Sequence, residues 1–197
     1  MTTDKYEIRA LYNDKSIAVY SAFSDSIADV AIQNQKLLPP FTYSRMTWIK
    51  PSFLWMMYRS DWGNRAGMNR ILRIWINRKD WEAALKEAIL ITPEPHVYKN
   101  HKGWRAKLEK ARVRVQWDPE RDIENQRLDF KSIQVGITEK LSEVYAKKWI
   151  SKIEDVTSLT HEMQGLVLRK NLSEAKKLLP VEIKYPVNKE IIASLGM

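Results

Sequence analysis

RVRVQWDPER (residues 112–121) is the stretch of the chain that says most about its fold. Its first half alternates arginine with valine, which is typical of a strand with one buried face. Its second half brings an amide, a tryptophan, two acids and an arginine, with Pro119 among them. Because proline cannot donate to a sheet ladder, Pro119 is expected to end the pairing of the strand. Such concentrated polarity at a strand end marks a candidate site.

A second unusual stretch, RMTWIKPSFLWMMYRSDW (45–62), is dense in tryptophan, methionine, lysine and arginine. Residues 45–49 look extended, and Lys50 precedes a proline, which biases it away from helix. Residues 52–60 are apolar nearly all round, so they predict a buried helix. We expect the two stretches to face one cleft, with Arg9 between them.

The remaining chain reads as short strands mixed with helices. Asn13-Asp14 is good turn chemistry and predicts a hairpin. The predicted strands are 6–12, 16–23, 71–78, 111–118 and 131–137. The predicted helices are 25–38, 52–60, 80–90, 104–111 (a short helix or a lead-in), 138–171 (broken near 155–157) and 171–179. A polar connection is expected at 119–130, and residues 181–197 form a tail of mild strand character.

Neighbouring strands look hairpin-like and do not follow strict β-α-β alternation. This pattern favours an α+β fold with a mixed, largely antiparallel sheet and flanking helices. The 197 residues show no repeat or linker-like composition. We therefore expect one domain over 1–197, with C-terminal helices and a tail from about residue 138.

The composition excludes several classes of protein. The chain has no cysteine, which rules out disulfides, thiolate metal sites and a cysteine nucleophile. No stretch approaches the roughly 20 apolar residues of a membrane span. The first residues lack the charged, apolar and small-residue order of a signal peptide. We expect a cytoplasmic protein with no membrane partner, and its oligomeric state stays open.

The net charge of +9, with a pI of about 9.6, bears on partners. Such a charge favours nucleic acid, nucleotide phosphates or an acidic surface. The alternative is a basic composition with no specific partner.

Familiar catalytic fingerprints are missing. The chain has no GxxxxGK[ST] or GxGxxG phosphate loop, no HExxH and no GxSxG elbow. Its histidines, His96, His101 and His161, lack standard metal spacing, so no metal site is expected. An enzyme built from this chain would have to use Arg, Lys, Tyr, Ser, Gln and carboxylates.

The first two predicted strands carry three candidate ligand-binding residues. Arg9 lies within a strand and needs a partner, because an unpaired buried charge is costly. That partner is either a structural carboxylate, such as Glu7 or Asp118, or a phosphate held by the guanidinium fork. Tyr20 is either a core aromatic or a surface for stacking, and Ser21 follows it.

The start of the predicted helix at 52–60 offers a possible anion site. Lys50 precedes it, Ser52 lies in its first turn and Arg59 near its end. Free backbone N–H groups at a helix start favour an anion. In the alternative, Ser52 only caps the helix and Lys50 is solvated.

Gln116, Asp118 and Glu120 recur with period two, so a strand would present them on one face. Two acids and an amide suit the orientation of a sugar hydroxyl and the stabilisation of a cationic transition state at a ribose carbon. The alternative is a strand-end loop whose acids are neutralised by nearby arginines. Gln134 is a second strand amide and could be an internal hydrogen-bond bridge.

Four segments together resemble the family catalogued as domain of unknown function 4291. They are IRALYNDKSIAVYSAFS, TWIKPSFLWMMYRSDWG, VQWDPERD and KSIQVGITEKLSEVYAKKWISKIEDVT. The sequence departs from the family pattern at Ser21, where glutamine is usual, and at Lys131, where arginine is common. In fold grouping, the family resembles the ADP-ribosyltransferase-like proteins, which bind NAD in a cleft between two small sheets.

That resemblance implies roles for the candidate residues. Arg9 takes the place of the first-strand Arg or His, and Tyr20 or Ser21 that of the second-strand Ser or Tyr. Gln116 and Asp118 match the later Gln-x-acid pair, with Glu120 nearby. The Ser-Thr-Ser motif of such enzymes is absent, and the acid precedes a proline, which puts activity in question.

Two functions follow as expectations. The first is an NAD-dependent ADP-ribosyltransferase that modifies a nucleic-acid or other anionic acceptor, in which Arg9 holds the pyrophosphate or the nicotinamide ribose and Tyr20 stacks on nicotinamide. The second is a non-catalytic basic module that binds RNA or DNA. In that module, Lys50, Arg59, Arg65, Arg70, Arg73 and Arg78 would contact phosphates, and Trp48, Trp62 or Trp75 would stack on bases.

Overall fold

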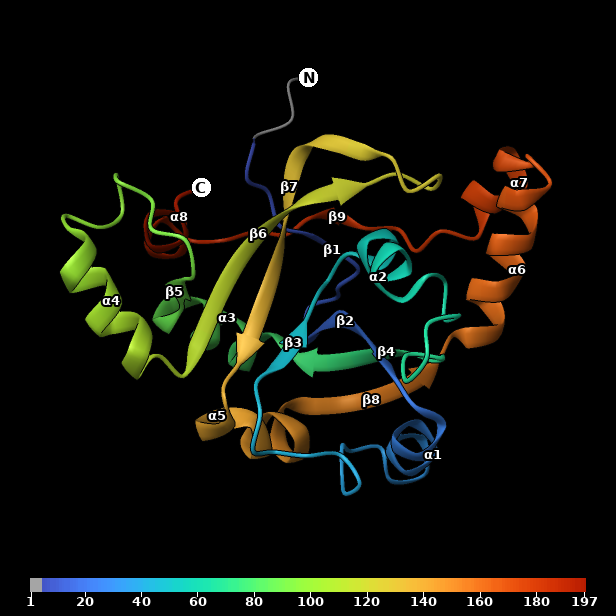
Figure 1. The fold of residues 1–197 in the computed structure, drawn as a ribbon, viewed down its shortest axis with the longest axis horizontal. Coiled ribbons are helices and arrows are strands. Elements are labelled where there is room, and N and C mark those ends of the chain that lie inside the picture. Colours follow the sequence, from blue (N-terminus) through green and yellow to red (C-terminus); the bar gives the residue numbers. More distant parts are fainter. Residues whose placement is uncertain (1–4) are drawn as a thin grey trace.

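The computed structural model describes residues 5–197, whose strands form two main sheets and one small ribbon (Figure 1). The three-stranded sheet has the order β2 (Ser16–Phe23), β4 (Arg70–Asn77), β8 (Ile150–Asp155). The four-stranded sheet has the order β3 (Thr47–Ile49), β7 (Arg127–Ile137), β6 (Val113–Arg121), β5 (Ile89–Leu90). The ribbon pairs β1 (Arg9–Ala10) with β9 (Ile183–Lys184). All pairs are antiparallel except β5–β6, so the predicted single-domain α+β class with mixed, largely antiparallel sheets is confirmed.

Helices flank both sheets. They are α1 (Asp25–Asn34), α2 (Phe53–Ser60), α3 (Arg78–Glu87), α4 (His101–Lys110), α5 (Glu139–Val144), a π-helical turn η1 (Tyr145–Trp149), α6 (Thr157–Leu168), α7 (Leu172–Lys177) and α8 (Lys189–Leu195). In Figure 1, α4 and α8 lie at one end of the molecule and α6 and α7 at the other. Helix α2 contacts both β2 and β6, so it sits where the two sheets meet.

The two sheets join at one point and separate beyond it. Tyr20 of β2 donates its N–H group to the carbonyl of Lys50, just after β3, at 2.7 Å. In an antiparallel continuation, Ala22 would next face Trp48. Within residues 5–197 no such pairing forms, and the two strand edges diverge. This split opens a cleft between the sheets.

Strand β2 is buried on both faces, which explains its continuous apolar run. Val19 belongs to the main core, which fills the space around both sheets. Tyr20, on the other face, belongs to a second cluster with Phe53 of α2 and Met163 of α6. Strand β2 forms one side of the cleft.

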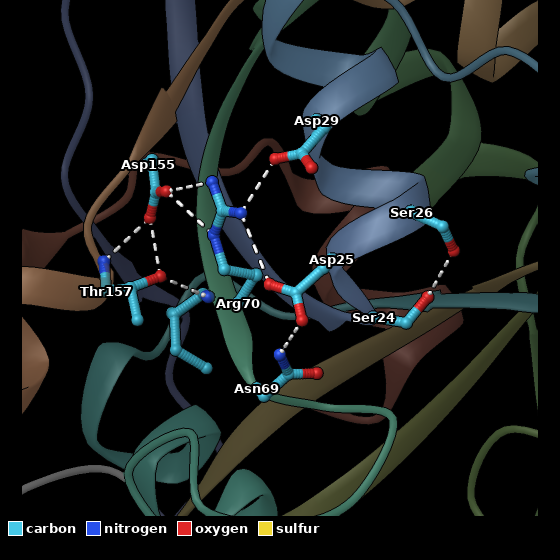
Figure 2. Close-up of polar contacts among 9 residues, drawn as sticks. Ser24, Asp25, Ser26, Asp29, Asn69, Arg70, Asp155 and Thr157 are labelled. Atoms are coloured by element: carbon cyan, nitrogen blue, oxygen red, sulfur yellow. Dashed lines mark hydrogen bonds and ion pairs between the residues drawn. The ribbon is translucent and has the colours of Figure 1, made fainter.

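Arg70 at the start of β4 ties three elements together (Figure 2). Its guanidinium contacts Asp25 at 3.3 Å and Asp29 at 2.7 Å, both in α1, and Asp155 at the end of β8 at 2.6 Å. Hydrogen bonds to Asp155 and then to Asp29 raise the pKa of Arg70. This cation is therefore a structural link between α1 and the three-stranded sheet.

The helix predicted over 138–171 is wrong in its middle, where β8 forms an edge strand. Ile150 and Ile153 are three residues apart, which is a helical spacing. The ladder with β4 contains a register shift that leaves Ser151 as an extra residue. Such a bulge lets two residues three apart both face the core.

The predicted N-terminal hairpin forms only at its turn. Asn13 Oδ1 accepts hydrogen bonds from the N–H groups of Lys15 and Ser16, both at 2.9 Å. The preceding strand is short, however, because β1 leaves β2 and pairs with β9 in the C-terminal tail. The tail thus completes the ribbon and then forms α8, which the mild strand pattern did not predict.

The polar connection predicted over 119–130 is also shorter than expected. Strand β6 continues to Arg121 and β7 begins at Arg127. Pro119 lies inside β6, next to a register shift, so it does not end the strand. The predicted helices at 52–60 and 104–111 are confirmed as α2 and α4.

Candidate functional site

A cavity of about 660 Å³ opens in the cleft between β2 and β3, and we call it the cleft cavity. Its volume lies within the range of small-molecule sites, about 300–1,000 Å³. Its polar and aromatic lining includes Ser21, Arg45, Trp48, Trp55, Arg59, Gln116 and Gln134. Both stretches singled out in the sequence contribute, as expected.

The nine predicted site residues divide into three groups. Ser21, Arg59 and Gln116 line the cleft cavity. Arg9, Ser52 and Glu120 line a separate cavity of about 190 Å³, the side cavity. Tyr20, Lys50 and Asp118 are buried and line neither. The predicted set is therefore close in space but does not form one pocket.

Lys50 and Asp118 form a buried ion pair that joins the two stretches. Lys50 Nζ lies 3.0 Å from Asp118 Oδ2 and 3.7 Å above the ring of Trp55. Lys50 is 0% exposed, so it is not the solvated lysine of the sequence alternative. Burial lowers the pKa of Lys50 to about 8, although the Asp118 carboxylate opposes this. The pair lies behind Trp55 and Gln116, which line the cleft cavity.

Asp118 fixes the side chain of Gln116. Gln116 Nε2 donates to Asp118 Oδ1 at 2.6 Å. An ionised carboxylate only accepts hydrogen bonds, so the amide must turn its NH₂ group toward Asp118. Gln116 Oε1 therefore remains as an acceptor for a ligand in the cleft cavity.

Ser52 caps α2 and contacts Glu120. Its hydroxyl accepts from Trp55 N–H at 3.1 Å and donates to Glu120 Oε1 at 2.8 Å. Glu120 Oε1 also accepts from the N–H group of Arg121 at 2.9 Å. The capping role that was the alternative for Ser52 is confirmed, and Glu120 lines the side cavity instead of the cleft cavity.

Glu182 of the tail is a half-buried acid that the sequence did not single out. Its Oε1 accepts from Phe53 N–H, at the start of α2, at 2.7 Å. Burial, and to a smaller extent the charge of Glu120, raises the pKa of Glu182 well above its usual value, while the Phe53 hydrogen bond and then Arg9 and Arg73 oppose the rise. No local pattern around residue 182 predicts this contact, because it depends on where the tail crosses the fold.

Arg9 has a structural carboxylate as its partner. Its guanidinium lies 3.0 Å from Glu7 Oε1 and also donates to the carbonyl of Glu182 at 3.4 Å. The Arg9 side chain is 41% exposed, at the side cavity. The structural alternative from the sequence is confirmed. The expected place of Arg9 between the two stretches is also found, but in the side cavity, which Ser52 and Glu120 line with it, and not in the cleft cavity.

Tyr20 and Ser21 point to different environments. The Tyr20 ring packs edge-on against Phe53, with centroids 5.3 Å apart, and burial raises the pKa of its hydroxyl. It is a core aromatic in this structure. Ser21 is only 4% exposed and lines the cleft cavity, and its Oγ has no hydrogen-bond partner within residues 5–197.

A glycine lets aromatic side chains approach the sheet beside the cavity. Gly136 of β7 pairs with Trp48 of β3. A Cβ atom at Gly136 would lie 2.7 Å from Met46 Sδ and 2.9 Å from Trp48 Cζ3, which is closer than packed atoms come. Trp55 belongs to the buried cluster around Tyr20, and it lines the cleft cavity together with Trp48.

Two other kinds of site are not found in the part of the chain that the structure describes. Residues 5–197 hold no group of three or more His, Asp or Glu placed to bind a metal ion. Nor do they include a helix long and apolar enough to cross a membrane.

The chain belongs to the family described as Domain of unknown function (DUF4291), whose model matches residues 7–185. The matched range covers both sequence stretches, the split between the sheets and every predicted site residue. No curated protein matches the chain.

Proposed function

We propose that the protein binds NAD in the cleft cavity and transfers its ADP-ribose group to a nucleic-acid or other anionic acceptor. The observation that carries this proposal is the split between β2 and β3 next to the Tyr20–Lys50 bridge. It places a cavity of about 660 Å³ between two sheets, lined by amides, a serine, two tryptophans and two arginines. These groups complement a ligand that combines planar rings, hydroxyls and phosphates.

The strand edges at the split offer backbone groups to a ligand. Tyr20 and Lys50 face each other across the bridge, so by alternation Ala22 and Trp48 direct their N–H and C=O groups into the cleft. Both residues line the cleft cavity. An adjacent donor and acceptor on a backbone edge suits a carboxamide such as that of nicotinamide.

Two arginines stand at the cavity with their charges available. Arg45 and Arg59 are exposed, and neither forms an ion pair within residues 5–197. A guanidinium fork binds phosphate oxygens bidentately. We assign these arginines to the pyrophosphate of NAD, in place of Arg9, which already has Glu7 as a partner.

The reaction requires stabilisation of positive charge. The bond between nicotinamide N1 and ribose C1′ breaks, its electron pair leaves with nicotinamide, and an acceptor atom forms a bond to C1′ and loses its proton. Gln116 lines the cavity and donates its NH₂ group to Asp118 at 2.6 Å, which leaves its Oε1 as an acceptor. In this proposal Gln116 Oε1, which has two lone pairs, uses one of them to accept from a ribose hydroxyl, and Asp118 supplies the negative charge that favours the cationic state of the ribose.

The second candidate, a non-catalytic nucleic-acid-binding module, has fewer available cations than the sequence indicated. Four of its six proposed phosphate contacts are engaged: Lys50 with Asp118, Arg70 with three aspartates, Arg73 with Glu154 and Arg78 with Glu82. Trp62 is buried, and Trp75 donates its indole N–H to Glu154. We therefore favour the enzyme.

The test is to incubate the protein with adenine-labelled NAD, alone and with RNA or DNA, and to measure nicotinamide release and label transfer. We expect both activities in the wild type and a loss of about 100-fold or more in Asp118→Asn, as for other groups that stabilise transition-state charge. The exposed Glu109→Gln variant in α4 is the control. Wild-type rates in Asp118→Asn, or no release at all, would contradict the proposal.

A further inference from the structure

Gln116 and Gln134 form a matched pair of amides on the floor of the cleft cavity. They are direct Cα partners in the β6–β7 ladder, and both line the cavity. Side chains directly opposite each other in an antiparallel pair have Cβ atoms about 4.5–5.5 Å apart. The two amide groups are therefore close enough to contact one ligand group together.

The two amides differ in how they are held. The NH₂ group of Gln116 is turned toward Asp118, at 2.6 Å, and Asp118 is itself held by Lys50 at 3.0 Å. Gln116 therefore presents its oxygen as a fixed acceptor. Gln134 is half-buried and makes no side-chain hydrogen bond within residues 5–197, so its amide can supply a donor beside that acceptor.

The opposite wall of the cavity also carries a polar group that a ligand could bind. Ser21 of β2 is 4% exposed, and its hydroxyl is without a partner in the described chain. A buried polar group without a partner costs free energy that a ligand hydrogen bond recovers. Trp48 and Trp55 add apolar aromatic walls, which favour a planar group.

We propose that Gln134 is a specificity-determining residue, which together with Gln116 selects ligands that carry a hydrogen-bond donor and an acceptor side by side on a planar edge. This inference rests on the proposed function for its first ligand, NAD. NAD contains two such edges, the carboxamide of nicotinamide and the amino edge of adenine. Paired hydrogen bonds from a glutamine amide are a strong form of such recognition.

The test uses calorimetric titration with three probes. They are NAD, nicotinic acid adenine dinucleotide, which replaces the carboxamide by a carboxylate, and nicotinamide hypoxanthine dinucleotide, which replaces the adenine amino group by a carbonyl. We expect the wild type to bind one analogue about tenfold or more weakly than NAD, since one bidentate contact discriminates by that much. The analogue that loses affinity identifies which edge the amide pair contacts.

The variant Gln134→Met keeps the size of the side chain but removes its donor and acceptor, and we expect it to bind NAD and the discriminated analogue equally. Gln134→Glu keeps the shape of the side chain but removes its donor, so we expect it to bind NAD more weakly than the wild type does. The control is Gln126→Met, in the exposed hairpin loop between β6 and β7. Thermal unfolding checks that each variant folds.

A wild type that binds all three dinucleotides equally would overturn the inference, and so would a Gln134→Met variant that still discriminates. If no dinucleotide binds, the proposed function fails. The amide pair is then tested by titration with two pairs of smaller ligands, adenosine monophosphate against inosine monophosphate and nicotinamide against nicotinate. Binding of one member of a pair, lost in Gln134→Met, would retain the inference without NAD. No binding in that panel would overturn it.

Discussion

At the scale of single residues, the Lys50–Asp118 pair decides how the two sequence stretches meet. Both charges are withdrawn from water, and the Lys50 side chain is 1% exposed. Removing one partner of a buried pair leaves an uncompensated charge, whereas removing both does not. The stability of the cleft wall therefore depends on the pair as a unit.

We expect Lys50→Met and Asp118→Asn each to lower the free energy of unfolding by about 3–5 kcal/mol. The double variant should lose much less than the sum, because no buried charge is left alone. Urea denaturation of the four proteins measures this coupling. Additive losses would show that the two groups do not interact.

The pKa of Lys50 also gives a pH dependence. Since its folded pKa is lowered to about 8, the folded state binds fewer protons than the unfolded state between about pH 8 and 10.5. Its contribution to stability is thus lost as the pH falls through about 8 and grows as the pH rises above it. The difference in free energy of unfolding between wild type and Lys50→Met should widen from pH 7 to pH 9. A constant difference would contradict the lowered pKa.

The pH dependence of stability that comes from Glu182 runs in the opposite direction to that from Lys50. Its raised pKa means that the folded state keeps a proton that the unfolded state loses, so its contribution is present below the unfolded pKa of about 4.5 and is lost as the pH rises through the folded pKa. We expect Glu182→Gln, which retains an acceptor for Phe53 N–H, to raise stability at pH 7 by about 1 kcal/mol. Thermal unfolding at several pH values measures this, with the exposed Glu162→Gln as control. A Glu182→Gln variant that is less stable than the wild type at pH 7 would mean that Glu182 is ionised in the folded state and stabilised by its hydrogen-bond partners.

At the scale of elements, the start of α2 is bonded both to strand β6, through Ser52 and Glu120, and to the tail, through Phe53 and Glu182. Ser52 both caps Trp55 N–H and binds Glu120. We expect Ser52→Ala to cost about 2 kcal/mol, at the upper end of cap substitutions, because Glu120 also loses a partner. The comparison is Asn100→Ala in α4, whose side chain accepts only from Gly103 N–H and should cost about 1 kcal/mol. Chemical denaturation ranks the two, and a smaller loss for Ser52→Ala would contradict the double role.

Gly136 of β7 controls the shape of the cleft. Its missing Cβ leaves room for Met46 Sδ, which would lie 2.7 Å away, and for the Trp48 ring. Gly136→Ala should displace these side chains and cost about 1–3 kcal/mol of stability, as overpacking does. We also expect weaker NAD binding, because Trp48 lines the cavity. Unchanged affinity in a folded Gly136→Ala protein would mean that Trp48 does not contact the ligand.

The sequence predicts elements well where the period of the apolar residues is regular. The strand of Gln116 and Asp118 follows this rule, whereas the helix at 52–60 is predicted from its nearly continuous apolar composition. A bulge defeats it, as in β8, where Ile150 and Ile153 mimic a helix. The register shift after Pro119 has the same effect on β6 and β7, and it hides the fact that Gln134 lies opposite Gln116.

At the scale of the whole molecule, the α+β class follows from the order of hairpin-like strands and helices. The division of the site into two cavities does not, because it depends on contacts between distant segments. Arg9 and Glu182 meet only because the tail crosses to pair with β1. The cations of the basic chain are also placed by tertiary contacts, as the aspartates around Arg70 show (Figure 2).

The most direct test of NAD binding in the cleft is a calorimetric titration of the wild type and of Gln116→Ala with NAD. We expect saturable binding of one NAD per chain and a loss of affinity of about tenfold in Gln116→Ala, since one ligand-facing amide is removed. No binding by the wild type, or equal binding by Gln116→Ala, would contradict an NAD site between β2 and β3.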